Sequence, residues 1–135
     1  MLKLVDIAAR TGQPPVRALL SLAVGSSDTE ILLTHEIRYR NDQFRAIYGL
    51  YEGDSILGIV GLARYPSRGT TKILHMAVAG QPSDRTLART LVARALSEQL
   101  QQQIHWGFAD EYEDVASELG FRPTASGIWK LDRRH

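Results

Sequence analysis

Three strand-like runs in the middle of the chain limit the folds that it can adopt. Phe44–Tyr51 and Ser55–Tyr65 are rich in β-branched and aromatic residues, and Thr70–Ala79 is a third run of similar character. The first two runs are separated by Glu52–Asp54, whose central glycine can take the positive φ that a tight turn requires. The sequence therefore predicts a β-hairpin followed by a third strand.

A helix is expected directly after the third run. Gly80–Asp84 combines strand-breaking residues with a polar residue that can cap a helix. Beyond it, apolar residues recur at helical spacing and form a wide stripe: Leu87, Ala88, Leu91, Val92, Ala95 and Leu96. This arrangement predicts a strand that leads through a short turn into a helix.

The N-terminal part of the chain predicts one strand and two helices. Leu2–Ile7 is the expected first strand. Val16–Val24 is apolar and follows two prolines, which favour the first turn of a helix. Asp28 is expected to cap a second helix, whose amphipathic stripe contains Ile31, Leu32, His35 and Tyr39.

The C-terminal part predicts a strand, a helix and a closing strand. Ile104–Ala109 is the expected strand, and Glu111–Leu119 is the helix, with Gly120 as its C-terminal stop. Ser126–Leu131 is predicted to close the chain as a strand. The expected order of elements along the whole chain is β-α-α-β-β-β-α-β-α-β.

The composition is that of one ordinary globular domain. The chain has 135 residues, 44% of them hydrophobic, which is enough for a single domain spanning residues 1–135 with its own core. A formal net charge of +1 argues against a protein that mainly binds nucleic acid through phosphates. The chain has no cysteine, which excludes disulfides and cysteine nucleophiles, and its four histidines lack the spacing of metal ligands. We therefore expect no metal and no nucleic-acid partner.

Membrane insertion and secretion are not expected. No apolar run approaches the roughly 20 residues that a helix needs to cross a bilayer. The first residues reach Asp6 before the apolar core of a signal peptide could form. The predicted compartment is the cytoplasm.

Four segments resemble the GCN5-related N-acetyltransferases. RAIYGLYEGDSILGIVGL (Arg45–Leu62) is similar to the second and third strands of that family, and ILHMAV (Ile73–Val78) is similar to the fourth. SDRTLARTL (Ser83–Leu91) lies where the family has its pyrophosphate loop, and ELGF (Glu118–Phe121) matches its late helix ending in Gly-Phe. The resemblance covers roughly residue 31 to the C-terminus and implies an α/β (α+β) fold with a mixed, mostly antiparallel central sheet flanked by helices.

The resemblance also implies a reaction and a co-substrate. Family members move an acetyl group from acetyl-CoA directly to a primary amine, here of a small-molecule or peptide acceptor. Met76, Ala77 and Val78 would hold the pantetheine arm, with backbone N–H groups around Ala77 and Val78 stabilising the oxyanion. The pyrophosphate would bind at the start of the following helix, whose free N–H groups and dipole favour anions, at Asp84, Arg85, Thr86, Leu87, Ala88 and Arg89. Edge strands of this fold leave room for a homodimer.

The pyrophosphate segment departs from the family pattern. Asp84 and Thr86 stand at two positions that the family fills with glycine, and only Ala88 is small enough for the third. Ser83 replaces the usual Arg or Gln, although Arg85 and Arg89 lie nearby. Either arginines rebuild the phosphate site, or coenzyme binding is weakened or lost. The alternative function is that of a non-catalytic protein of this fold, which would act as a regulatory module that binds coenzyme A or a protein partner.

Three side chains are candidates for proton transfer. His75 lies on the expected cofactor strand and could be a base acting through water, or a core histidine without a catalytic role. Glu36 could shape the acceptor pocket or lie on a solvated helix face. Ala116 stands where the family often has a tyrosine general acid, and Tyr112, one helical turn earlier, is the possible substitute.

Two other readings have weaker support. Asp6–Gly12 resembles the first half of a helix-turn-helix, but the prolines that follow it stand where DNA-reading residues would lie. The acidic residues between 110 and 114 could attract a cationic amine, yet acids are also favoured in the first turn of any helix.

Overall fold

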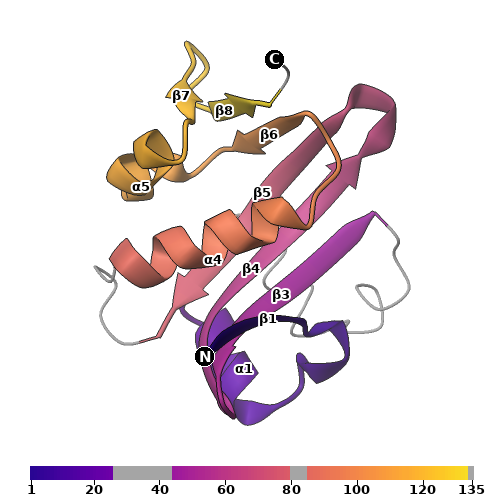
Figure 1. Cartoon of the computed structure of the whole chain (residues 1–135), viewed down its shortest axis with the longest axis vertical. Helices are drawn as coiled ribbons and strands as arrows, with labels where there is room; N and C mark the ends of the chain where they lie inside the picture. The colour runs from indigo at the N-terminus through magenta and orange to yellow at the C-terminus, as the bar shows by residue number, and fades with distance from the viewer. Residues whose placement is uncertain (26–43, 80–84, 134–135) are drawn as a thin grey trace.

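A computed structural model describes residues 1–25, 44–79 and 85–133 (Figure 1). Within these residues, eight strands form one sheet in the order β1-β3-β4-β5-β6-β8-β7, and β2 pairs with β5 outside this path. The strands are β1 (Leu2–Asp6), β2 (Val24–Gly25), β3 (Arg45–Glu52), β4 (Ser55–Tyr65), β5 (Thr70–Val78), β6 (Gln103–Trp106), β7 (Arg122–Pro123) and β8 (Trp129–Asp132). The helices are α1 (Pro14–Leu20), α4 (Arg85–Ser97), α5 (Glu113–Glu118) and the 3₁₀ turns η1 (Ala8–Arg10), η2 (Pro66–Arg68) and η3 (Ala109–Tyr112).

The predicted hairpin is confirmed and forms the middle of the sheet. β3 and β4 pair antiparallel from Arg45↔Ala63 to Glu52↔Ser55, and Gly53 in the turn has φ +59°. β5 returns antiparallel along β4, so the three predicted runs lie side by side. β6 is parallel to β5, and the other pairs in the sheet are antiparallel, which confirms the mixed, mostly antiparallel class.

A β-bulge divides β5 into two halves. Leu62 pairs with Ile73 and Gly61 with His75, so Leu74 has no partner on β4. On its other edge, β5 pairs with β6 from Thr70 to Ile73 only. The bulge therefore coincides with the point at which β5 loses its parallel neighbour.

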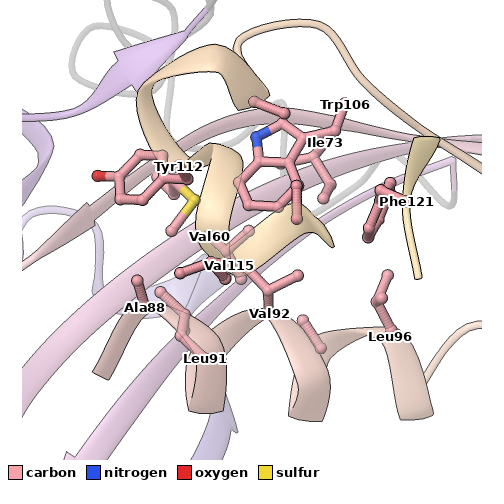
Figure 2. Close-up of a cluster of buried hydrophobic side chains, with 14 of the residues drawn as sticks. Val60, Ile73, Ala88, Leu91, Val92, Leu96, Trp106, Tyr112, Val115 and Phe121 are labelled. Atoms are coloured by element: carbon pink, nitrogen blue, oxygen red, sulfur yellow. The ribbon is translucent and has the colours of Figure 1, made fainter. Parts of the chain in front are cut away.

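The two faces of the sheet carry separate apolar clusters. On one face, α4 and α5 cover Val60, Leu62 and Met76, and Figure 2 shows the labelled side chains of α4 pointing toward those of the sheet, η3 and α5. On the other face, α1 packs its Val16, Leu19 and Leu20 against side chains of β3, β4 and β5. Residues alternate between these faces because successive side chains of a strand point to opposite sides.

Several predicted boundaries were wrong. The helix expected over Val16–Val24 begins at Pro14, ends at Leu20 and is followed by β2, because the prolines themselves fill its first turn. The strand expected to reach Ala109 ends at Trp106, and the helix expected over Glu111–Leu119 is a 3₁₀ turn followed by α5. The closing strand is β8 rather than Ser126–Leu131, and β7 was not predicted. The second predicted helix lies outside the described residues.

Leu91 anchors α4 on the sheet, since it is fully buried and its Cδ2 would lie 3.2 Å from a Cβ at Gly58 of β4. We expect Leu91→Ala to lower the free energy of unfolding by about 2–5 kcal/mol through lost burial and the cavity left behind. Urea denaturation measures this change. Ala93→Ser, at an exposed position of the same helix, is the control and should change stability by roughly 0.5 kcal/mol or less. Equal effects of the two substitutions would contradict this packing.

Candidate functional site

The second half of β5 presents a different edge from the first half. After Ile73 the edge that faced β6 pairs instead with β2, through Val24↔Met76 and Gly25↔His75. No pair joins β2 to β5 beyond Met76. Ala77 and Val78 therefore form the last part of β5, beyond the residues that pair with β2.

Backbone alternation identifies which N–H groups face outward at this end of β5. The Ala79 N–H donates to the Leu57 carbonyl at 2.7 Å, so at Ala79 the N–H points toward β4. Because N–H groups two residues apart point the same way in a strand, the Ala77 N–H also faces β4, whereas those of Met76 and Val78 face the opposite edge. Of the two predicted oxyanion donors, the Val78 N–H is the one on the edge that β6 has left.

His75 is held inside the sheet rather than at its surface. Its side chain is fully buried, and its ring covers Gly61 on β4 so closely that a Cβ there would lie 2.2 Å from Nε2 and 2.4 Å from Cε1. His75 pairs across from Gly61 and shares the α1 face of the sheet with Ile59 and Ala77. This glycine is therefore required for the imidazole to occupy its place.

Tyr112 lies on the opposite face, in the cluster under α4 and α5. It is 5% exposed, and its ring stacks with Trp106 at a centroid distance of 5.9 Å and 24° between the planes. Figure 2 shows its hydroxyl pointing away from the other labelled side chains. Burial raises the pKa of Tyr112, Glu111 raises it further, and the Arg85 guanidinium, 5.3 Å from the ring centroid, opposes both. The structure separates the two described candidates for proton transfer, His75 and Tyr112, onto different faces.

Arg85 and Arg89 both point toward η3 and α5. Arg85 donates from Nη1 to the Glu111 carbonyl at 2.9 Å, and its Nε lies 3.6 Å from an Asp114 carboxylate oxygen. Arg89 forms an ion pair with Glu118 at 2.9 Å. Their four-residue spacing places both cations on one side of α4. Each of the two arginines thus contacts α5 or the turn before it.

The remaining predicted cofactor residues divide between core and solvent. Met76 of β5 and Ala88 of α4 are fully buried where the helix packs on the sheet, and Leu87 is partly buried against the same cluster. Thr86 is exposed at the start of the helix. Glu36 and Asp84 lie outside the described residues.

An acidic hollow of about 440 Å³ adjoins Arg85. Four carboxylate side chains and Ser117 line it with that arginine: Asp110, Glu111, Glu113 and Asp114. Sequence analysis singled out these acids but missed their contact with Arg85. The signal was present as charge complementarity between the start of one helix and the acidic segment 25 residues later. The pairing of β2 with β5 was also missed, and Val24–Gly25 carries no local pattern that indicates it.

Metal and membrane sites find no support within the described residues. No group of three or more His, Cys, Asp or Glu side chains there is placed to hold a metal ion. None of the helices in the same residues combines the length and the apolar character needed to span a bilayer.

Comparison with solved structures identifies the fold. An acetyltransferase of the GNAT family from Staphylococcus aureus Mu50 aligns with a TM-score of 0.73 at 15% identity, covering 99% of this chain and 100% of that one. An IAA acetyltransferase from Bacillus cereus aligns at 0.66 and 19% identity, covering 93% and 79%. A dodecameric spermidine N-acetyltransferase from Vibrio cholerae aligns at 0.71 and 13% identity, covering 98% and 94%. No family model and no curated protein matches the sequence. The chain thus has the fold of the GCN5-related N-acetyltransferases, as its strand–helix order predicted.

The close approach of His75 to Gly61 can be tested by a double-mutant cycle. We expect Gly61→Ala to lower the free energy of unfolding by about 1–3 kcal/mol, because the new methyl group displaces the imidazole. In the His75→Ala background the same substitution should cost less, since the obstructing ring is gone. Urea denaturation of the four proteins measures the coupling. Additive effects, within about 0.5 kcal/mol, would contradict the contact.

Proposed function

We propose that this protein is an N-acetyltransferase that moves the acetyl group of acetyl-CoA directly to a primary amine in the cytoplasm. The proposal rests on one observation. β5 pairs with β6 only as far as Ile73, and the Val78 N–H further along β5 faces the same edge, shortly before α4 begins. The solved structures with this fold include several acetyltransferases. Since a fold hosts many functions, the argument depends on what these particular residues can do.

The pantetheine arm is proposed to pair with the outer edge of β5 at Ala77 and Val78. Met76 was expected to share in this, but its outer edge already pairs with Val24. The Val78 N–H is thus the best donor for the thioester carbonyl. A fixed N–H in a buried setting stabilises the developing oxyanion more than water would, and it needs no reorganisation during the reaction.

The pyrophosphate is proposed to bind at the start of α4, on the segment from Asp84 to Arg89. The unpaired N–H groups of a helix start and its dipole attract phosphate, and Arg85 and Arg89 add two cations. Both arginines would exchange carboxylate partners for phosphate oxygens. Their present ion pairs have side chains roughly half exposed, and such pairs contribute only about 0.2–1 kcal/mol each, so the exchange is inexpensive.

Direct attack is favoured because the chain has no cysteine that could carry an acyl group. The neutral amine nitrogen bonds to the carbonyl carbon, the C–S bond breaks, and the amine loses a proton to a base acting through water. His75 and Glu36 are the proposed candidates for this base. Tyr112 is the proposed acid that protonates the leaving thiolate. Burial raises the pKa of Tyr112, which keeps the phenol protonated and able to donate at neutral pH.

The acceptor is proposed to be a cationic small molecule or peptide amine. The acidic hollow beside Arg85 favours a positively charged ligand, and one of the similar structures is a spermidine N-acetyltransferase. A homodimer built on an edge of the sheet is also proposed.

A non-catalytic binder of the same fold is the second candidate. It is favoured by Thr86 at a position that the family fills with glycine, and by the carboxylate partners of Arg85 and Arg89. Such a protein would bind coenzyme A or a partner protein without transferring the acetyl group.

Thermal unfolding with acetyl-CoA tests cofactor binding. A ligand that binds only the folded state adds about 2.7 kcal/mol at a concentration 100 times its Kd, so we expect a clear rise in Tm. Absence of any shift at millimolar acetyl-CoA would overturn the proposal. Because the chain has no cysteine, a thiol reagent detects released coenzyme A without background. Acceptor-dependent thiol release distinguishes the enzyme from the silent binder.

The double variant Arg85→Ala/Arg89→Ala tests the pyrophosphate site. We expect it to abolish the Tm shift, because both added cations are lost from the start of α4. Arg94→Ala is the control: it removes one cation from the last turn of the same helix, where Arg94 donates to the Leu2 carbonyl. If the double variant and the control bind acetyl-CoA equally well, the pyrophosphate lies elsewhere.

Tyr112→Phe tests the proposed acid. We expect kcat to fall by about 10²-fold with little change in KM for acetyl-CoA, since the hydroxyl would act only on the leaving thiolate. The raised pKa of Tyr112 also predicts the direction of a pH effect. The phenol is protonated below that pKa, so any loss of kcat at alkaline pH that is due to Tyr112 should occur above the usual pKa of a tyrosine and vanish in the variant. Unchanged kcat across pH would remove Tyr112 from the mechanism.

A further inference from the structure

Arg85 contacts three groups of the segment that carries Tyr112. Its guanidinium carbon lies 5.3 Å from the centroid of the Tyr112 ring, its Nη1 donates to the Glu111 carbonyl at 2.9 Å, and its Nε lies 3.6 Å from the Asp114 carboxylate. A ring contact, a backbone hydrogen bond and an ion pair thus join the first residue of α4 to three positions in η3 and α5.

These contacts matter because neither η3 nor α5 has a side-chain cap at its start. η3 is a 3₁₀ turn of four residues without a side-chain cap, and α5 begins at Glu113, where its N-cap residue Tyr112 makes no side-chain cap hydrogen bond. Short 3₁₀ turns have poor hydrogen-bond geometry, so their position depends on outside contacts. Trp106 stacks with the Tyr112 ring, Trp129 donates to Asp110 at 2.9 Å, and Arg85 supplies the contact from α4.

We propose that Arg85 is a positioning residue for Tyr112, and that anion binding at the start of α4 is coupled to Tyr112 through it. The proposal rests on the proposed function for its meaning in catalysis, but the contacts stand without it. When the guanidinium turns to a phosphate oxygen, the ring loses its cation and the Glu111 carbonyl loses a donor. The surroundings of the Tyr112 ring therefore change when an anion fills the phosphate site.

The direction of this coupling follows from the charges around Tyr112. Glu111 on its own turn disfavours the phenolate, and Arg85 on α4 is the cation that favours it, with Asp114 of α5 paired to that cation. Loss of the cation should therefore raise the pKa of Tyr112. A filled phosphate site would hold the phenol in its protonated form, which is the form that can donate to a leaving thiolate.

Arg89 provides a matched comparison. It lies one turn further along α4, carries the same charge and forms an ion pair with α5 through Glu118. Glu118 is the last residue of α5, whereas the partners of Arg85 lie in η3 and the first turn of α5. Arg89→Gln therefore removes a cation and an interhelical ion pair while leaving the proposed coupling in place.

The test is an alkaline titration of tyrosine labelled with ¹³C at the ring carbon bearing the hydroxyl, followed by NMR on the free protein. Tyr112→Phe identifies the resonance. We expect Arg85→Gln to move the Tyr112 midpoint to higher pH, Arg85→Lys to restore part of the change, and Arg89→Gln to leave it near the wild-type value. Equal midpoints in wild type and Arg85→Gln, or equal shifts in the Gln variants at 85 and 89, would overturn the proposal.

Inorganic diphosphate added to the wild-type protein provides a second measurement that does not depend on any variant folding. We expect it to raise the Tyr112 midpoint as Arg85→Gln does, and to have no effect in that variant. A shift in Arg85→Gln without a response to diphosphate supports the positioning role but counts against the proposed phosphate site. A diphosphate response of equal size in Arg85→Gln would overturn the coupling, because the signal would not pass through Arg85.

Discussion

The bulge in β5 lies where the middle of the sheet changes its strand pairing. An eight-stranded sheet with regular pairing presents no free backbone except at its two edges. Here Leu74 has no partner on β4, and β6 stays with β5 only as far as Ile73. Among the described residues, no strand pairs with Val78 on the edge of β5 toward which its N–H points. Every later step of the proposed chemistry starts from this one irregularity.

The bulge also changes which side chains face each cluster. Ile73 and Met76 both face α4, although residues three apart in a regular strand point to opposite faces. His75 is then directed to the α1 face, where only a glycine at position 61 leaves room for its ring. A histidine that is fully buried against a glycine is first of all a packing element. If His75 acted as the base, water would have to reach its buried ring from the place where the amine binds. Glu36 therefore stays a second candidate for the base.

Local patterns predicted the part of the fold that depends on local physics. The sequence predicted the turn at Gly53, the strands β3, β4 and β5, and the apolar stripe of α4. These features could be predicted because φ preferences and hydrophobic periodicity act over a few residues. The pairing of Val24 with Met76 joins residues 52 positions apart, and nothing in a dipeptide of Val and Gly encodes it. Tyr112 was singled out from the sequence as a candidate acid, but its ring neighbours Trp106 and Arg85 come from other elements and follow only from the fold.

Two residues of α4, Thr86 and Ala88, stand at positions of the family's glycine pattern and differ in burial. Ala88, the small residue that was kept, is fully buried against the sheet, where a larger side chain would push the helix away. Thr86 is exposed, so its side chain costs the fold nothing and obstructs only a ligand that approaches the helix start. The small residue that packing requires is therefore kept at position 88, while Thr86 adds a side chain at the exposed start of the helix. Arginines reach further than backbone N–H groups, so a site built on Arg85 and Arg89 can hold a phosphate at a distance that a threonine allows.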